Sequence, residues 1–361
     1  FIYKELILLD KNNYQIKLKF IASLINSVKI EEALQYIRIT KFEKHFEDKI
    51  LTLQGLAYFK LNKFNEAQDF INSALIINKD NSDSHSIQGL IYESLGFINK
   101  ALRSHAEAIK SNNRNYVAFN NLAACYSFVG DIDLSISNFK EAIKINPNFF
   151  DGIYRLGQMQ IYNGDFVNGW INFRERWKSS DYVHKKLITS KPLLNKIESK
   201  NIKILAWNEQ GLGDQVMYGS MFNEFSKLTS NLIVKLDKRL INVFEKNHPK
   251  IKFVGIDDFV SEDQYDKHIP FGDMGIHLRN TKDAFLKTDF PYISGSEKTK
   301  NLIIQKYKKK DFLLVGISWS SSNYLLSKHK SLSLERLYPL LKIKNIKFIS
   351  LDYKNDKEEI R

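Results

Sequence analysis

The sequence predicts an α-solenoid of helical repeats over residues 1–183, followed by an α/β region with a Rossmann-like parallel sheet. Two observations predict this fold class. A 34-residue period runs through the first half of the 361-residue chain, and after residue 200 short apolar strands alternate with amphipathic helices. A loop with two glycines, residues 208–214, follows the first of those strands. Such a loop indicates a ligand site.

The repeat period is carried by small residues. Each unit contains two amphipathic helices, and we expect small residues where the two helices meet, because close approach of the backbones leaves little side-chain volume. Turns rich in Asn and Asp separate the units and can cap the next helix. The first register contains Ile21, Gly55, Gly89, Ala123 and Gly157, all of them small except the isoleucine. The second register, twelve residues later, contains Ala33, Ala67, Ala101, Ser135 and Gly169.

This pattern resembles the tetratricopeptide repeat. The resemblance covers five repeats from about residue 14 to 183, with part of an earlier repeat before them, so we expect the chain to begin inside a repeat. It implies a protein or peptide partner in the groove lined by the first helix of each repeat. Asn120 and Asn121 are candidates for that groove, although asparagine does not recur at this position in neighbouring units. The bulky segment 169–177 is expected to contact the next domain.

The second half is expected to contain two domains. A Lys-rich linker spans 184–200, a first Rossmann-like domain spans 201–293, and residues 294–361 begin a second such domain that is incomplete. In the first domain the sequence predicts strands over 203–207, 232–236 and 252–254, and helices over 215–228 and 238–247. In the second it predicts strands over 315–319 and 348–351.

The loop after the first strand carries the strongest functional signal. Gly211 and Gly213 allow a tight turn and close approach of a ligand, and the N-terminus of the following helix favours an anion. Asp214 stands at the start of that helix. There a carboxylate either caps the helix or acts as a general base, and the residues alone leave both roles open.

Three segments in this order resemble bacterial repeat proteins with a glycosyltransferase-like C-terminal region: residues 209–214, 265–270 and 315–320. That region is similar to heptosyltransferases and, more distantly, to O-linked N-acetylglucosamine transferases. Both have the GT-B architecture of two Rossmann-like domains facing across a cleft. The resemblance implies sugar transfer from a nucleotide-sugar donor to a protein or glycan acceptor. The nucleotide sugar would be the substrate, and no cofactor or metal is implied.

The same resemblance assigns roles to individual residues. Asp214 would be the catalytic base, and Gly211 and Gly213 would shape the donor loop. His268 would line the acceptor side or make a structural hydrogen bond. The donor contacts would be Ser318, Ser320, Asn323 and Lys330, with Lys328 and His329 as alternatives to the lysine; an ordinary polar turn is the alternative for residues 320–323. Because a complete second GT-B domain is longer than 294–361, we expect activity to belong to a longer protein.

Composition and charge argue against several other classes of function. The net charge is +13, but lysines alternate with acidic residues, so nucleic-acid binding, which would depend strongly on salt, ranks last. The single cysteine, Cys125, excludes an intrachain disulfide, and no apolar stretch is long enough for a membrane span, so we expect a cytoplasmic protein unless an upstream signal exists. No spacing of His, Cys and carboxylates predicts a metal site. The rival function is a non-catalytic interaction scaffold with a degenerate transferase domain.

Overall fold

A computed structural model describes residues 2–287, 291–307, 312–320 and 331–352. The chain divides into two compact units, Phe1–Asp289 and Phe290–Arg361. The first unit contains both the helical repeats and a parallel β-sheet, and the second contains a smaller parallel strand pair.

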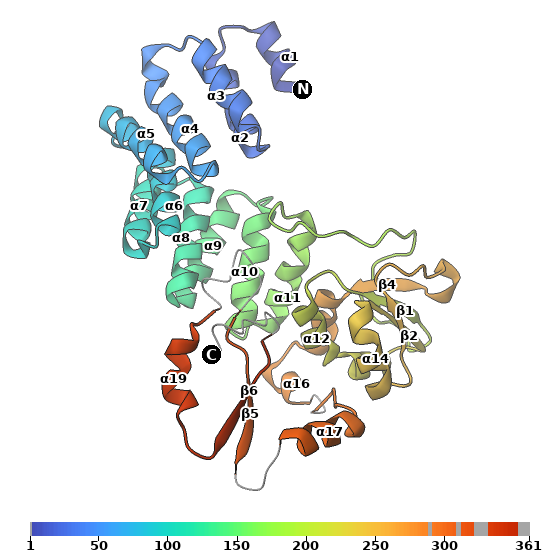
Figure 1. Cartoon of the computed structure of the whole chain (residues 1–361). Helices are drawn as coiled ribbons and strands as arrows, with labels where there is room; N and C mark the ends of the chain where they lie inside the picture. Colours follow the sequence, from blue (N-terminus) through green and yellow to red (C-terminus); the bar gives the residue numbers. More distant parts are fainter. Residues whose placement is uncertain (1, 288–290, 308–311, 321–330, 353–361) are drawn as a thin grey trace. The chain divides into compact units, whose positions relative to one another are not determined.

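The repeats form a helical solenoid, as predicted, in which successive helices pair along the chain (Figure 1). Pairing is strongest within each predicted repeat, where the two helices lie side by side. The helices are α1 Ile2–Leu9, α2 Tyr14–Asn26, α3 Ile30–Ile39, α4 Glu47–Lys60, α5 Phe64–Ile77, α6 Ser82–Ser94, α7 Ile98–Ser111, α8 Tyr116–Val129, α9 Ile132–Ile145, α10 Phe150–Tyr162 and α11 Phe166–Arg174, with 3₁₀ turns η1 Lys44–Phe46 and η2 Glu175–Lys178.

Small residues allow this pairing. A Cβ added to Gly55 would lie 2.5 Å from the Ile71 side chain, and one added to Gly157 would lie 2.4 Å from the backbone nitrogen of Phe173. Ala123, which holds the same register as these glycines, is fully buried. The second helix of each repeat therefore rests almost directly on the backbone of the first.

The turn between the two helices of each repeat has a second periodicity. One residue there adopts a positive φ in five successive repeats, and these residues are 34 positions apart. They are Val28, Asn62, Gly96, Gly130 and Gly164, with φ of 60°, 59°, 81°, 88° and 87°. Glycine and asparagine tolerate this left-handed conformation, whereas a β-branched residue is strained in it. The turn conformation is thus a property of the repeat and not of the residue that occupies it.

Asparagines join neighbouring repeats. The Asn81 and Asn115 side chains cap α6 and α8 by accepting from Ser84 N and Ala118 N. Their amide groups reach back to the preceding repeat, where Asn81 Nδ2 donates to Asp48 Oδ2 at 2.9 Å and Asn115 Nδ2 donates to Ser82 Oγ at 2.9 Å. Each of these asparagines therefore caps the first helix of its own repeat and also hydrogen bonds to the first helix of the preceding repeat.

The sheet of the first unit contains four parallel strands in the order β3-β2-β1-β4. Helices α12 and α14 follow β1 and β2 along the chain (Figure 1). Residue Leu205 of β1 pairs with Ile233 of β2 and with His268 of β4. The elements are β1 Lys203–Trp207, α12 Leu212–Gly219, α13 Phe222–Ser226, β2 Asn231–Leu236, α14 Lys238–Asn247, β3 Lys252–Gly255, η3 Glu262–Gln264, β4 Lys267–Pro270, η4 Phe271–Met274, α15 Gly275–Leu278 and α16 Lys282–Leu286.

The helix predicted over 215–228 is two helices, α12 and α13. The Ser220 hydroxyl donates to the Met217 carbonyl at 2.7 Å, which offers the backbone an alternative to the helical hydrogen bond. A Cβ on Gly219 would lie 2.4 Å from the Phe244 ring. The break lets both Phe222 and Phe225 become fully buried.

The Lys-rich segment 184–200 lies along the sheet. Leu194 N donates to the His268 carbonyl at 2.8 Å, and His268 N donates to the Pro192 carbonyl at 3.1 Å. Leu194 is fully buried. This segment therefore extends the edge of the sheet beside β4.

The second unit contains α17 Glu297–Tyr307, β5 Leu313–Ile317, α19 Leu334–Leu341 and β6 Ile346–Ser350. Strands β5 and β6 are parallel, with Val315 opposite Phe348. Both begin two residues before the predicted strands, because Leu313 and Ile346 extend the ladder at its start.

Candidate functional site at the junction of the repeats and the sheet

The glycine loop lies at the carboxyl end of β1. Helix α12 begins at Leu212, and the Asp214 Oδ2 accepts a hydrogen bond from Gly211 N at 3.1 Å. Asp214 is half-buried, while Gly211 and Gly213 are exposed. A Cβ added to Gly213 would meet nothing within 4 Å. One carboxylate oxygen of Asp214 therefore serves the helix start, and space lies open above the loop.

The strand order places this loop beside a change of chain direction. From β1 the chain continues to β2 on one side, while β4 lies on the other side of β1. At such a point the loops after the two central strands separate, and open parallel sheets bind ligands in the resulting crevice. The loop after β1 carries Glu209, and η4, directly after β4, carries Asp273.

Arg176 from the last repeat bridges these two loops. Its Nη2 lies 2.6 Å from Glu209 Oε2, and its Nη1 lies 2.6 Å from Asp273 Oδ1. The three side chains are fully buried. Arg174 adds a second cation, because its Nε lies 2.8 Å from Asp273 Oδ2. Glu209 Oε1 also accepts from Gly272 N at 2.8 Å. We call the set Arg174, Arg176, Glu209 and Asp273 the junction network.

Aromatic rings enclose the buried arginine. The Arg176 guanidinium carbon lies 4.6 Å from the ring centroid of Phe173, 4.9 Å from that of Trp177 and 5.6 Å from that of Tyr182. The two neighbouring carboxylates, Glu209 and Asp273, outweigh burial and raise the pKa of Arg176. The guanidinium therefore keeps its charge, and two carboxylates balance the two arginines.

Other contacts strengthen the same junction. Trp170 Nε1 donates to the Arg279 carbonyl at 2.7 Å, and the Trp170 ring lies against Gly275, where a Cβ would approach it to 2.5 Å. The prediction that the bulky segment 169–177 contacts the next domain is thus met by Trp170, Arg174 and Arg176. Sequence reasoning missed their carboxylate partners, although Glu209 stands inside the glycine-loop motif.

His268 lies on β4 next to this junction and is half-buried. Trp207 Nε1 donates to its Nδ1 at 3.1 Å, which requires the neutral tautomer protonated on Nε2. Burial lowers the pKa of His268. The imidazole is therefore held by β1 as a neutral hydrogen-bond acceptor at Nδ1, and its Nε2–H remains for another partner.

The candidate donor residues belong to the second unit. Ser318 is exposed and Ser320 is half-buried after β5. The Ser320 N–H donates to Asp352 Oδ2 at 2.8 Å, so a carboxylate already binds one of the loop amides expected to face a diphosphate. Asn323 and Lys330, with Lys328 and His329, lie outside the described residues.

The groove candidates Asn120 and Asn121 are buried within α8, with 6% and 8% of their surface exposed. Asn120 Nδ2 donates to Asn121 Oδ1 at 3.2 Å, and Asn121 Nδ2 donates to Ser86 Oγ at 3.3 Å. Asn121 therefore joins α8 to α6, whereas Asn120 bonds within α8 and its Oδ1 has no partner among the described residues. Little side-chain surface of either residue is left for a bound peptide.

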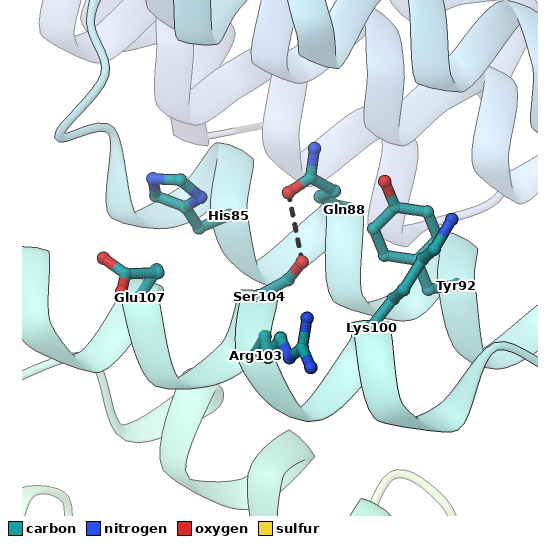
Figure 2. A pocket seen from close by; sticks show the side chains of 7 residues that line it. All are labelled: His85, Gln88, Tyr92, Lys100, Arg103, Ser104 and Glu107. Atoms are coloured by element: carbon teal, nitrogen blue, oxygen red, sulfur yellow. Dashed lines mark hydrogen bonds between the residues drawn. The ribbon is translucent and has the colours of Figure 1, made fainter.

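A surface pocket of about 260 Å³ lies between α6 and α7 (Figure 2). Gln88 and Ser104 point toward each other in it, and Ser104 Oγ donates to Gln88 Oε1 at 3.0 Å. The Lys100 ammonium lies 5.5 Å from the Tyr92 ring centroid. The lining residues are His85, Gln88, Tyr92, Lys100, Arg103, Ser104 and Glu107. Two cations against one carboxylate suit an anionic side chain of a partner.

Comparison with known proteins identifies the helical half. A family model of the tetratricopeptide repeat matches residues 48–81 and 116–149. The chain contains tetratricopeptide repeats. The matched segments are α4 with α5 and α8 with α9, which begin 68 residues apart and so obey the 34-residue period. Such repeats are protein-interaction modules with extended binding surfaces. No helix in the described ranges is both long and apolar enough to cross a lipid bilayer.

The chain is also similar to individual proteins. Protein FlbA of Caulobacter vibrioides is 25% identical over 175 residues, which is 44% of this chain and 29% of that protein. The chain thus spans less than a third of this relative. Among solved structures, TTC0263 of Thermus thermophilus has a TM-score of 0.41 and 14% identity, covering 47% of this chain and 92% of its own. A Thermobaculum terrenum O-GlcNAc transferase mutant has a TM-score of 0.37 and 12% identity, and the match covers 54% of this chain and 38% of that one. Such low scores carry no functional argument.

Proposed function

We propose that the chain belongs to a glycosyltransferase in which the repeats hold a protein partner and the parallel sheet binds a nucleotide-sugar donor. The observation that carries this proposal is the open glycine loop at the carboxyl end of β1, beside the change of chain direction between β1 and β4. The strand order β3-β2-β1-β4 is the central part of the Rossmann order, which supports a nucleotide as the ligand.

The loop is suited to a phosphate group. The first backbone N–H groups of a helix have no intrahelical partner, and the helix dipole favours an anion at this end. Gly211 and Gly213 are exposed, and space is open where a Gly213 side chain would stand. A diphosphate can therefore reach the amides at the start of α12 without displacing a side chain.

Asp214 is the proposed base. Its Oδ2 caps Gly211 N at 3.1 Å, while the described residues give its Oδ1 no hydrogen bond. A half-exposed carboxylate with one free oxygen can accept the proton of an acceptor hydroxyl while the other oxygen fixes its position. His268 is proposed on the acceptor side, where its Nε2–H would donate to a sugar or peptide oxygen. Ser318 and Ser320, with Asn323 and Lys330, are proposed as donor contacts.

Nucleotide release and sugar transfer test this proposal. The full chain and the longest natural form of the protein are incubated with UDP-, GDP- and ADP-linked sugars, and release of the nucleoside diphosphate is measured. We expect Asp214→Ala to abolish release. Asp237→Ala is the matched control, because Asp237 caps α14 after β2 through Arg239 N and would be equally costly to the fold. Equal turnover in native protein and Asp214→Ala would exclude Asp214 as the base.

A second function is favoured by the junction network. Arg176 occupies the space between Glu209 and Asp273, where a ligand of an open parallel sheet would otherwise lie. If the sheet binds no nucleotide, the chain is a non-catalytic interaction scaffold in which the sheet supports the last repeat. Absence of binding by every nucleotide sugar, combined with retention of a protein partner by the repeats, would establish this alternative.

A further inference from the structure

Three chemically reactive side chains meet inside the solenoid, away from the glycine loop. Glu93 is on α6, His105 is on α7 and Cys125 is on α8. Their ligating atoms all lie within 4.8 Å of one another. His105 and Cys125 are buried, with 0% and 1% exposed, while the Glu93 side chain is 28% exposed. His105 and Cys125 are therefore shielded from solvent, and the cluster reaches solvent through the Glu93 carboxylate.

The neighbouring repeats show that helix packing does not require these residues. At the registers of His105 and Glu93 the solenoid core otherwise uses mainly apolar side chains, and small or apolar residues occupy the register of Cys125. The equivalents of His105 are Ile71, Phe139 and Phe173, those of Glu93 are Phe59, Ser127 and Ile161, and those of Cys125 are Ala57, Ile91 and Met159. A buried polar cluster costs stability relative to apolar packing, so its presence at this one junction of two repeats points to a role other than packing.

The hydrogen bonds converge on one carboxylate oxygen. His105 Nε2 lies 2.7 Å from Glu93 Oε1, and Cys125 Sγ donates to the same oxygen at 3.2 Å. His105 Nδ1 is buried and has no partner among the described residues. The imidazole lies directly on Gly89, where a Cβ would approach the ring to 2.3 Å. The hydrogen bond to Glu93 directs His105 Nε2 toward the cluster.

We propose that Glu93, His105 and Cys125 form a binding site for Zn²⁺, with a fourth position open to water. Thiolate, imidazole and carboxylate are the three ligand types that zinc combines in proteins, and three protein ligands with one open position form a known coordination pattern. The site would connect α6, α7 and α8, and so would link two successive repeats through the metal.

Zinc binding requires small movements of the ligand side chains. Tetrahedral zinc with its usual bond lengths separates ligand atoms by roughly 3.3–3.6 Å. Glu93 Oε1 lies closer than this to both partners because it now hydrogen bonds to them, and all three ligand atoms lie within 4.8 Å of one another. The Glu93 side chain is part-exposed and can withdraw toward solvent, while His105 Nε2 and Cys125 Sγ would adjust toward the metal. The metal would take the place of the two hydrogen-bonded protons.

The protons have defined destinations. Burial, and then the Glu93 carboxylate, raise the pKa of the Cys125 thiol, so the metal-free residue is a neutral S–H donor. Zinc binding releases this proton to solvent and leaves the thiolate as ligand. The imidazole stays neutral and moves its proton from Nε2 to Nδ1, which leaves the Nε2 lone pair for the metal.

Titration of the reduced, metal-free full chain with Co²⁺ and then Zn²⁺ tests the site. We expect one Co²⁺ per chain with a thiolate-to-metal charge-transfer absorption, displaced by one Zn²⁺, and a higher Tm with saturating Zn²⁺. Cys125→Ala and His105→Phe copy residues found at the same registers in other repeats, namely Ala57 and Phe139, so these variants should fold. Each should remove the absorption and weaken Zn²⁺ binding at least about tenfold.

The matched control is His85→Ala, which removes a half-buried histidine outside the cluster from the same helix as Glu93 and should leave Zn²⁺ binding unchanged. The proposal is overturned if the folded native chain takes up no Zn²⁺ or Co²⁺ in stoichiometric amount. It is also overturned if Cys125→Ala, with native helical content by circular dichroism, keeps the Co²⁺ absorption. Neither result depends on the nucleotide-sugar proposal.

Discussion

Two kinds of contact hold this chain together, and they use different chemistry. Between the repeat that begins with α6 and the repeat that begins with α8, the Asn115 amide donates to the Ser82 hydroxyl at 2.9 Å. The same asparagine also caps α8. Between the last repeat and the sheet, Arg176 meets Glu209 and Asp273 in full burial. The first contact is local and repeated, whereas the second joins three distant segments and occurs at one place.

The difference lies in what happens when one partner is lost. A lost neutral cap leaves uncharged groups without partners, which costs less than leaving a charge unpaired. A buried charge that loses its partner has no substitute, since its desolvation is no longer compensated. We therefore expect substitutions to cost less between repeats than at the junction of the solenoid and the sheet.

The largest effect is expected from Arg176→Ala. This change leaves Glu209 and one oxygen of Asp273 buried without their guanidinium partner, so we expect the free energy of unfolding to fall by about 3–5 kcal/mol. Urea denaturation monitored by circular dichroism measures it. Arg155→Ala is the matched control, because Arg155 pairs with Asp181 in the same repeat at the surface and should cost less than about 1 kcal/mol.

The network as a unit gives a sharper test. The triple change Arg176→Met, Glu209→Gln and Asp273→Asn removes the three fully buried charges together. The amide oxygens introduced at positions 209 and 273 keep acceptors for Gly272 N and for the part-exposed Arg174. We expect this variant to be more stable than Arg176→Ala alone. A triple variant as unstable as the single variant would show that packing of the long arginine side chain, and not charge pairing, holds the junction.

A smaller effect is expected between repeats. Asn115→Ala removes the cap of α8 and the bond to Ser82 Oγ, so the free energy of unfolding should fall by about 0.5–2 kcal/mol. Asn115→Ser keeps a capping oxygen and places no second carboxylate beside Asp83, so it should recover part of the loss. The comparison between junction and repeats fails if Asn115→Ala costs as much as Arg176→Ala.

The smallest effect has the opposite sign. Val28 has a φ of 60° and is 82% exposed, so glycine would relieve its left-handed strain without loss of core contacts. We expect Val28→Gly to stabilise the chain by about 0.5–1 kcal/mol, the net of conformational relief and glycine entropy. Val167→Gly is the control: Val167 is exposed within α11, where glycine should destabilise. A lower Tm for Val28→Gly than for the native chain would contradict the interpretation that Val28 is strained.

Regular features of this fold were predictable from the sequence. The small residues Gly55, Gly89 and Ala123 gave the period, and the period gave the paired helices and the position of their close contacts. The apolar strands and the glycine loop likewise predicted parallel strands and a helix after the loop, although α12 starts at Leu212, before the predicted start at residue 215. These features depend on local spacing, which a single sequence displays directly.

Features built from distant residues were not predictable in this way. Arg176 meets Glu209 and Asp273 across 33 and 97 residues, and no spacing rule connects them. The cluster of Glu93, His105 and Cys125 was missed because its members stand 12 and 32 residues apart on three helices. Only comparison of each residue with its equivalents in the other repeats reveals that they replace apolar side chains.

Hydrogen–deuterium exchange with a nucleotide sugar bound tests the central proposal most directly. The full chain is exposed to saturating UDP-, GDP- and ADP-linked sugars, and exchange is followed in the peptides that cover residues 203–219. The proposal predicts that one nucleotide class slows exchange of the amides at Gly211–Asp214, at the start of α12, while α4 and α5 are unchanged. Unchanged exchange of this loop with every nucleotide sugar would contradict it and favour the scaffold function.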